Sequence, residues 1–163
     1  MFLVKVIFSR SMQPEKIASF TVDHNKLKEG IYISRTDGDI ITYDLRTRRP
    51  NKGDYMDNLT MHSAEHMIAT YIRSSAIGEN IIYFGPMGCQ TGFYLLVRDE
   101  KPERVLNILK ETLEKVINHE GVMFGASAIE CGNYKNLDVD AAKTECRRYL
   151  DILNGYTPDF KYE

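Results

Sequence analysis

Two pairs of neighbouring β-strand patterns, with one helical pattern between the pairs, constrain the fold of this chain more than any other feature. The first pair is IYISRT (31–36) and DIITYDLR (39–46), joined by a short loop with the Asp-Gly signal of a hairpin. The second pair is NIIYF (80–84) and TGFYLLV (91–97). Strands joined by short loops run antiparallel, and the chain lacks the regular βαβ alternation of parallel sheets. We therefore predict an α+β fold in which an antiparallel β-sheet packs against helices.

Three amphipathic helices are expected around this sheet. The first begins after YMDNLT, with Asn58 or Thr60 as its N-cap, and continues to Ile72 or Ser75. The second, PERVLNILKETLEKVIN (102–118), has proline in its first turn and an apolar stripe formed by Val105, Ile108, Leu109, Leu113 and Val116. The third, DVDAAKTECRRYLDIL (138–153), is expected to bury Val139, Ala142, Cys146, Tyr149 and Leu150.

The length of the chain and its turn signals indicate a single domain over residues 1–163. A chain of 163 residues buries roughly 70% of the surface that its unfolded form exposes, which is enough for one well-packed core. Turn signals at TDGD, NKGD and GPMG occur without the change in composition that marks a linker. The apolar first nine residues are expected to form either an additional edge strand or a disordered extension.

Charge and hydropathy narrow the class of partner. The chain has 21 Lys and Arg residues against 23 Asp and Glu residues, a formal charge of -2. No basic field exists that would indicate nucleic acid or an anionic membrane, so a small neutral or zwitterionic substrate fits better. No apolar run reaches about 18 residues, and the first eight residues lack the cleavage pattern of a secretory signal. We therefore expect a cytoplasmic protein.

The string HSAEH (62–66) is the strongest chemical signal. Positions four apart on a helix lie one turn apart on the same side, so His62 and His66 can direct imidazole nitrogens at one ion, with Glu65 beside them. In such a site the ion acts as a Lewis acid and the carboxylate moves a proton. The alternative is three polar residues that share a helix face by chance. The pattern also occurs in inverzincin peptidases, which are large proteins.

Two of the three cysteines extend the hypothesis of a metal site. Cys89 follows a Gly-rich turn, where a thiolate near a cation can exchange protons near neutral pH; the alternative is a small buried residue in a strand. Cys131, between the second and third predicted helices, can complete a His-His-Cys set with one coordination position open, or be an ordinary loop cysteine. An odd number of cysteines without CxxC spacing argues against a disulfide framework. Cys146 faces the core and has no predicted chemistry.

Taken together, these strings resemble the S-ribosylhomocysteine lyases, the LuxS-type enzymes. The matching strings, in order along the chain, are ASFTVDH (18–24), YDLRTRRPN (43–51), HSAEH (62–66), PMGCQTGFYL (86–95), ECGNY (130–134) and AAK (141–143). The resemblance extends from about Met12 to Leu153 and leaves residues 1–11 outside, as an extension. The chain departs from the pattern of the family at Arg48, Arg49, Tyr83, Gly85 and Leu137.

The resemblance implies a homodimeric metalloenzyme with active sites at the subunit interface. The implied reaction cleaves the thioether of S-ribosylhomocysteine to homocysteine and 4,5-dihydroxy-2,3-pentanedione, the precursor of autoinducer-2. The implied cofactor is one divalent ion per subunit, typically iron(II), for which zinc or cobalt can substitute. Carried over by motif, the metal ligands are His62, His66 and Cys131. A small metallohydrolase that uses the His-x-x-Glu-His helix is the alternative function.

The same resemblance assigns roles to residues outside the ligand set. Glu65 and Cys89 are implied as the general acid/base pair. The positions that match those lining the substrate pocket, some of them reaching it from the partner subunit, are Ser19, Phe20, His24 and Arg46. Without the resemblance, Arg46 begins the basic run RTRR, a pattern that is also typical of a solvated strand end.

Overall fold

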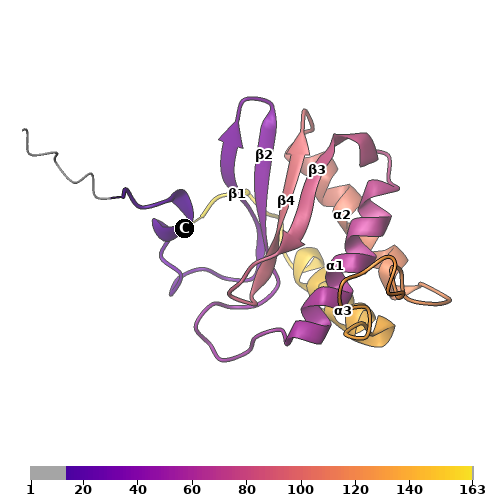
Figure 1. The fold of residues 1–163 in the computed structure, drawn as a ribbon. Coiled ribbons are helices and arrows are strands. Elements are labelled where there is room, and N and C mark those ends of the chain that lie inside the picture. Colours follow the sequence, from indigo (N-terminus) through magenta and orange to yellow (C-terminus); the bar gives the residue numbers. More distant parts are fainter. Residues whose placement is uncertain (1–13, 163) are drawn as a thin grey trace, which may run out of the picture.

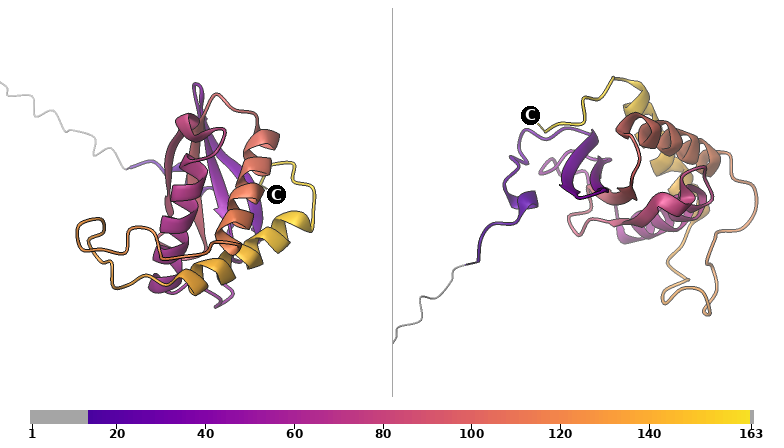
Figure 2. Two further views of the ribbon diagram at one scale, coloured as in Figure 1. Left: turned by 90° about the vertical axis from the view of Figure 1, so that its right-hand side faces the viewer. Right: turned by 90° about the horizontal axis from the view of Figure 1, so that it is seen from above.

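A four-stranded antiparallel sheet and three long helices make up the computed structural model, which describes residues 14–162 (Figure 1). The strands are β1 (Gly30–Asp37), β2 (Ile40–Arg46), β3 (Ile81–Pro86) and β4 (Gly92–Arg98). The helices are α1 (Asn58–Arg73), α2 (Pro102–Ile117) and α3 (Val139–Asn154), with short 3-10 turns at η1 (Ala18–Phe20) and η2 (Gly78–Asn80). The strand order is β1-β2-β4-β3, and the three helices cover one face of the sheet (Figure 2). The predicted α+β fold is confirmed, whereas the expected edge strand in the first nine residues lies outside the described residues.

The two central strands divide their side chains between the core and the opposite face of the sheet. Tyr43 and Leu45 on β2 and Phe93 on β4 are buried in the hydrophobic core beneath the helices. Because side chains alternate along a strand, Asp44 lies on the other face, where Tyr94 is its register partner on β4. The sheet therefore presents polar and tyrosine side chains on the face that the helices leave open.

Aspartate caps begin two of the helices. Helix α1 begins at Asn58, and the side chain of the preceding Asp57 accepts a hydrogen bond from the backbone N–H of Thr60 at 2.7 Å. The prediction that Asn58 or Thr60 would be the N-cap is therefore wrong, because Asp57 occupies the position from which a carboxylate reaches the first free N–H groups. Asp138 caps α3 in the same way and accepts from the backbone N–H of Ala141 at 2.8 Å.

The apolar faces of α2 and α3 supply much of the core. The predicted stripe of α2 is buried in full, and it consists of Val105, Ile108, Leu109, Leu113 and Val116. Of the residues predicted to be buried on α3, three are buried: Ala142, Cys146 and Tyr149. Val139 and Leu150 are only partly buried, and the buried positions include Glu145 and Leu153 instead. None of the helices in the described part of the chain has the length and apolarity that crossing a membrane requires.

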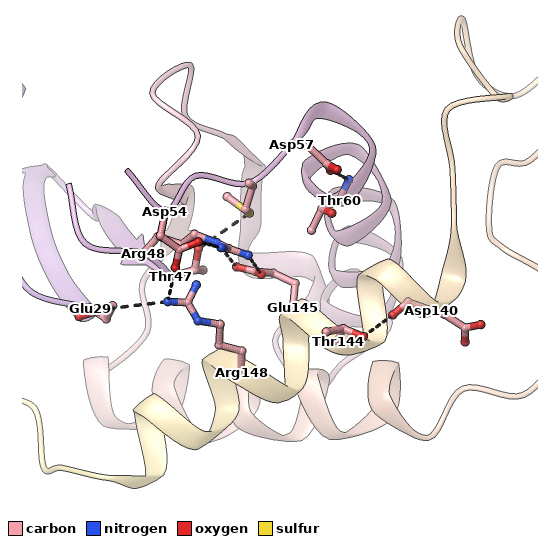
Figure 3. A network of polar contacts seen from close by, with 11 residues as sticks. Glu29, Thr47, Arg48, Asp54, Asp57, Thr60, Asp140, Thr144, Glu145 and Arg148 are labelled. Carbon is pink, nitrogen blue, oxygen red and sulfur yellow. Dashed lines mark hydrogen bonds and ion pairs between the residues drawn. The ribbon is translucent and has the colours of Figure 1, made fainter. Parts of the chain in front are cut away.

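Glu145 is buried because it pairs with a cation from the end of β2. Its Oε2 lies 2.5 Å from Nη2 of Arg48, whose side chain is 15% exposed and also pairs with Asp54. Arg148, on the next turn of α3, contacts Asp54 at 3.0 Å and Glu29 at 3.9 Å (Figure 3). This network joins β2 to α3, so the basic run at the end of β2 is partly buried rather than fully solvated.

We expect Glu145→Leu to lower the free energy of unfolding by roughly 2 kcal/mol, because it removes the buried partner of Arg48 and leaves this cation with only the exposed carboxylate of Asp54. Adding Arg48→Met should restore most of the loss, since two apolar side chains can occupy the same space. Urea denaturation followed by circular dichroism measures both effects. The control is Arg49→Gln, which alters an exposed ion pair with Glu29 and should change stability by less than about 0.5 kcal/mol. An unfolding free energy unchanged by Glu145→Leu alone would contradict this account.

Candidate metal centre and substrate pocket

One face of helix α1 packs into the core, and the other face carries polar residues. Ala64 and Met67 are fully buried, whereas His62, Glu65 and His66 are half-buried. The two imidazole rings lie one turn apart, with centroids 4.6 Å from each other and planes at 90°. The spacing of the HSAEH string therefore produces the arrangement that helical periodicity predicts.

Cys131 reaches the two histidines from the long loop between α2 and α3. Its Sγ lies 3.4 Å from Nε2 of His62. Each of Cys131, His62 and His66 offers one potential ligand atom, and these three atoms lie within 4.8 Å of one another. The backbone N–H of Asn133 also donates to this sulfur at 3.4 Å. The three residues that the sequence singled out as a possible ligand set therefore converge.

Backbone carbonyls orient both imidazoles. Nδ1 of His62 lies 2.9 Å from the carbonyl oxygen of Asn136, and Nδ1 of His66 lies 3.0 Å from that of Phe124. A carbonyl can only accept, so each Nδ1 carries the proton and each Nε2 keeps a free lone pair. This is the outer hydrogen bonding that metal-binding histidines usually make. Two neutral imidazoles and a thiolate form a donor set that suits zinc, iron(II) and similar divalent ions.

A glycine allows the loop to approach His66 this closely. Gly125 has φ of +69°, and a Cβ at this position would lie 2.7 Å from Nδ1 of His66. The loop is further held by His119, whose Nδ1 accepts a hydrogen bond from the hydroxyl of Tyr71 at 2.8 Å and whose Nε2 donates to the carbonyl of Val122 at 3.0 Å. Sequence reasoning missed these residues, although it singled out Cys131 in the same loop, and the local signal for the close approach to His66 was the glycine at position 125.

Glu65 lies beside the three converging residues without joining them. Its Oε2 is 3.8 Å from Nε2 of His66, and its side chain is 27% exposed. A carboxylate at this position can receive or deliver a proton at the edge of the site.

Cys89 lies on the turn between β3 and β4 and is exposed, so the alternative of a small buried residue in a strand is wrong. Its Sγ is 3.1 Å from Oγ1 of Thr91 and 3.7 Å from Nη1 of Arg46. Partial burial of the sulfur raises the pKa of Cys89, but the hydrogen bonds with Thr91 and the positive charge of Arg46 together outweigh it and lower the pKa below its ordinary value. Its thiolate is therefore favoured relative to that of a free cysteine.

Arg46 is a buried cation, 2% exposed, that other polar groups compensate. Its Nη2 donates to Oδ2 of Asp44 at 2.6 Å and its Nη1 to Oγ1 of Thr91 at 2.5 Å. Burial lowers the pKa of Arg46, but the charges and hydrogen bonds of Asp44 and Cys89 together outweigh it and raise the pKa above its ordinary value, so the guanidinium stays protonated. Sequence reasoning did not single out Asp44 or Thr91. The signal for Asp44 was its position two residues before Arg46, which places both on one face of β2.

Three of the four expected substrate-binding residues surround one small cavity. A small hollow, partly open to solvent, is lined by Ser19, Val22, His24, Leu27, Asp44, Arg46, Tyr94 and Tyr162. Phe20 is not among them and is 70% exposed. In the described part of the chain, no hydrogen bond connects this cavity to the three converging ligands. The expected site residues therefore form two groups, one around His62 and one around Arg46.

Comparison with known proteins gives a consistent result. A family model described as S-Ribosylhomocysteinase (LuxS) matches residues 17–157. The S-ribosylhomocysteine lyase of Finegoldia magna is 44% identical over 145 residues, which cover 86% of this chain and 92% of the relative. The S-ribosylhomocysteine lyase of Desulfotalea psychrophila is 45% identical over 148 residues, which cover 86% of this chain and 93% of the relative. That of Borreliella burgdorferi is 42% identical over 147 residues, with 86% and 94% covered.

The family match includes the helix, the turn and the loop that carry His62, Cys89 and Cys131. The identities of the three relatives are too high, over too much of each chain, to be a likeness of fold alone. This chain therefore belongs to the LuxS family of S-ribosylhomocysteine lyases.

Proposed function

We propose that this chain, a carbon-sulfur lyase, converts S-ribosylhomocysteine to homocysteine and 4,5-dihydroxy-2,3-pentanedione by isomerising the sugar and then eliminating the thiol. The observation that carries the proposal is the convergence of His62, His66 and Cys131, with the Nδ1 proton of both histidines held by backbone carbonyls. The membership of the LuxS family supports the substrate and the bond that is cleaved.

These three residues would hold one divalent ion per subunit, which we propose to be iron(II), with zinc or cobalt able to substitute. When bound, such an ion supplies a Lewis acid that polarises the oxygens of the sugar. Two imidazole nitrogens and one thiolate leave a coordination position for substrate, as catalytic sites of this kind require.

Cys89 and Glu65 are the groups that we propose to move protons. Direct cleavage of an unactivated carbon-sulfur bond is slow, so the carbonyl is first moved along the opened ribose by two enolisations until the sulfur is β to it. Each enolisation lifts a proton from one carbon and returns one to its neighbour. We assign the early transfers to the thiolate of Cys89, whose pKa is lowered, and the later ones to Glu65. In the elimination, a base removes the proton α to the carbonyl, a carbon-carbon double bond forms and the sulfur leaves with the bonding electrons.

Ser19, Phe20, His24 and Arg46 are the residues that we propose to bind the substrate. Support comes from the cavity that three of them share and from two buried atoms beside it, Oδ1 of Asp44 and Nε of Arg46, that have no hydrogen-bond partner in the described chain. One of these atoms is an acceptor and the other a donor, and a hydroxyl group of a substrate offers both functions.

We further propose that the active protein is a homodimer in the cytoplasm, with its active sites at the subunit interface. The side chain of Phe20 is 70% exposed, which suits a residue that contacts substrate bound to a partner subunit. The open face of the sheet carries a second hollow, whose lining includes Ser19, Tyr83, Tyr94 and Leu96, and a second copy of the chain would cover it.

A small metallohydrolase would use the same histidines and Glu65 but would give Cys89 no task. The hydrogen bonds that join Cys89, Thr91 and Arg46 disfavour that alternative, because they activate a thiol that hydrolysis does not need.

Cys89→Ser and Glu65→Gln should each lower turnover by roughly 100-fold or more, the usual contribution of a positioned acid/base group. The assay incubates the purified protein with S-ribosylhomocysteine and follows the released thiol of homocysteine with a colorimetric reagent. Glu79→Gln, an exposed substitution in η2, serves as the control and should leave turnover unchanged. Normal turnover in both Cys89→Ser and Glu65→Gln would exclude the assignment, and normal turnover in Cys89→Ser alone would favour the hydrolase.

Cobalt substitution should reveal the thiolate ligand. We expect the cobalt-loaded protein to show a sulfur-to-metal charge-transfer band that Cys131→Ser abolishes and Cys146→Ala retains, because Cys146 is buried in the core away from the histidines. Absorption spectroscopy and a metal-to-protein ratio near one measure this directly. A band that persists in Cys131→Ser would show that another group provides the sulfur.

The pH dependence of alkylation should report the activated thiol. Because the pKa of Cys89 is lowered, its thiolate form persists to lower pH than that of a free cysteine, and the midpoint of its alkylation by iodoacetamide should be lower as well. Arg46→Gln removes a cation that stabilises the thiolate and should move this midpoint upward. Mass spectrometry of the peptide that contains Cys89 gives the rate at each pH. A midpoint equal to that of free cysteine in the unsubstituted protein contradicts the argument.

A further inference from the structure

The C-terminal tail, residues 157–162, returns from the end of α3 to the open face of the sheet. Tyr156 begins this return, since its hydroxyl accepts a hydrogen bond from the backbone N–H of Ile31 on β1 at 2.9 Å. Further along, the carbonyl of Phe160 accepts from the backbone N–H of Ile33 at 2.8 Å. Because β1 is an edge strand, these N–H groups point away from β2 and are free to bind the tail. The tail therefore lies along β1 and ends beside residues 22–28 (Figure 1).

Specific contacts hold the tail in its docked position. The side chain of Phe160 is 8% exposed and belongs to the hydrophobic core. Its φ is +62°, a conformation that bulky residues rarely adopt and that persists only where the surrounding contacts favour it. The ring of Tyr162 then stacks on that of Tyr32, with centroids 5.0 Å apart and planes at 15°.

Tyr162 contacts the ion pair that holds Arg46. Its hydroxyl donates to Oδ2 of Asp44 at 3.0 Å, and the same oxygen accepts from Nη2 of Arg46 at 2.6 Å. The ring of Tyr162 also forms part of the wall of the cavity shared by Ser19, His24 and Arg46. Burial raises the pKa of Tyr162, so its hydroxyl remains protonated and able to donate.

This contact is made by a residue beyond the stretch that the family model matches. The family model matches residues 17–157, and Tyr162 follows five residues after its end. The sequence resemblance likewise ended near Leu153. The other residues that line the pocket lie within the matched region, whereas Tyr162 lies beyond it.

We propose that the C-terminal tail is part of the substrate pocket and that Tyr162 is a positioning residue, which orients Arg46 through its hydrogen bond to Asp44. This inference rests on the proposed substrate-binding role of Arg46. Oδ1 of Asp44 has no partner in the described chain, so without Tyr162 the buried carboxylate keeps Arg46 as its only described hydrogen-bond donor. The guanidinium would then be less firmly fixed against both the substrate and Cys89.

Tyr162→Phe tests the hydrogen bond, because the ring can still stack on Tyr32 and keep the tail in place. We expect this variant to raise KM for S-ribosylhomocysteine by about 10-fold while kcat changes by less than about threefold, since a hydrogen bond to a charged group is lost and the proton-moving groups are intact. A chain that ends after residue 157 should show at least the same increase. The control is Tyr156→Phe, which alters a hydrogen bond of the same return segment that does not reach the cavity, and whose KM should stay within twofold of the unsubstituted protein.

A second measurement separates positioning from a general loss of stability. If Tyr162 holds Arg46 through Asp44, Tyr162→Phe should raise the midpoint pH of Cys89 alkylation, whereas Tyr156→Phe should not. Equal KM values for the unsubstituted protein and Tyr162→Phe, or equal effects of Tyr162→Phe and Tyr156→Phe, would overturn the proposal. If the unsubstituted protein releases no thiol from S-ribosylhomocysteine, the proposed function fails, and the alkylation midpoint still decides whether Tyr162 positions Arg46.

Discussion

Helix α1 must bury one face in the core and offer two imidazoles on the other, and the arrangement of the site follows from this constraint. The buried face, with Ala64 and Met67, fixes the rotation of the helix about its axis. That rotation determines where His62 and His66 lie. The loop between α2 and α3 then supplies the remaining contacts, a thiol and two backbone carbonyls, from positions far away in the sequence. Core packing and ligand geometry are therefore coupled through a single rigid element.

The group of site residues around Arg46 depends on the buried guanidinium of this residue, which forms hydrogen bonds with more than one polar side chain. A guanidinium in the interior is unfavourable unless other groups satisfy it, and Arg46 has Asp44 on one nitrogen and Thr91 on another. The same charge lies 3.7 Å from the sulfur of Cys89 and favours its thiolate. The pair that makes burial of the cation possible thus also lies beside the thiol that it favours as a thiolate, so an element that contacts this pair affects both.

Local patterns predicted much of this structure, because strands, helices and the His-x-x-Glu-His spacing are properties of short segments. The apolar stripe of α2 and the face of α1 that carries His62 and His66 follow from helical periodicity alone. The residues that sequence reasoning missed depend on contacts between distant segments. Glu145 is buried only because Arg48 lies opposite it, and Gly125 matters only because His66 is its neighbour in space. No periodicity encodes such pairs.

The carbonyl that accepts from Nδ1 of His66 belongs to Phe124. The next residue, Gly125, can lie this close to the imidazole only because it has no Cβ. Cys131, the proposed thiolate ligand, lies in the same loop as both carbonyls that orient the histidines. If His62, His66 and Cys131 hold an ion as proposed, it would not leave by the breaking of one bond, since opening of the loop would release one ligand and the orientation of the other two together. Exchange of such an ion with the surrounding medium would then be governed by the frequency of that local opening.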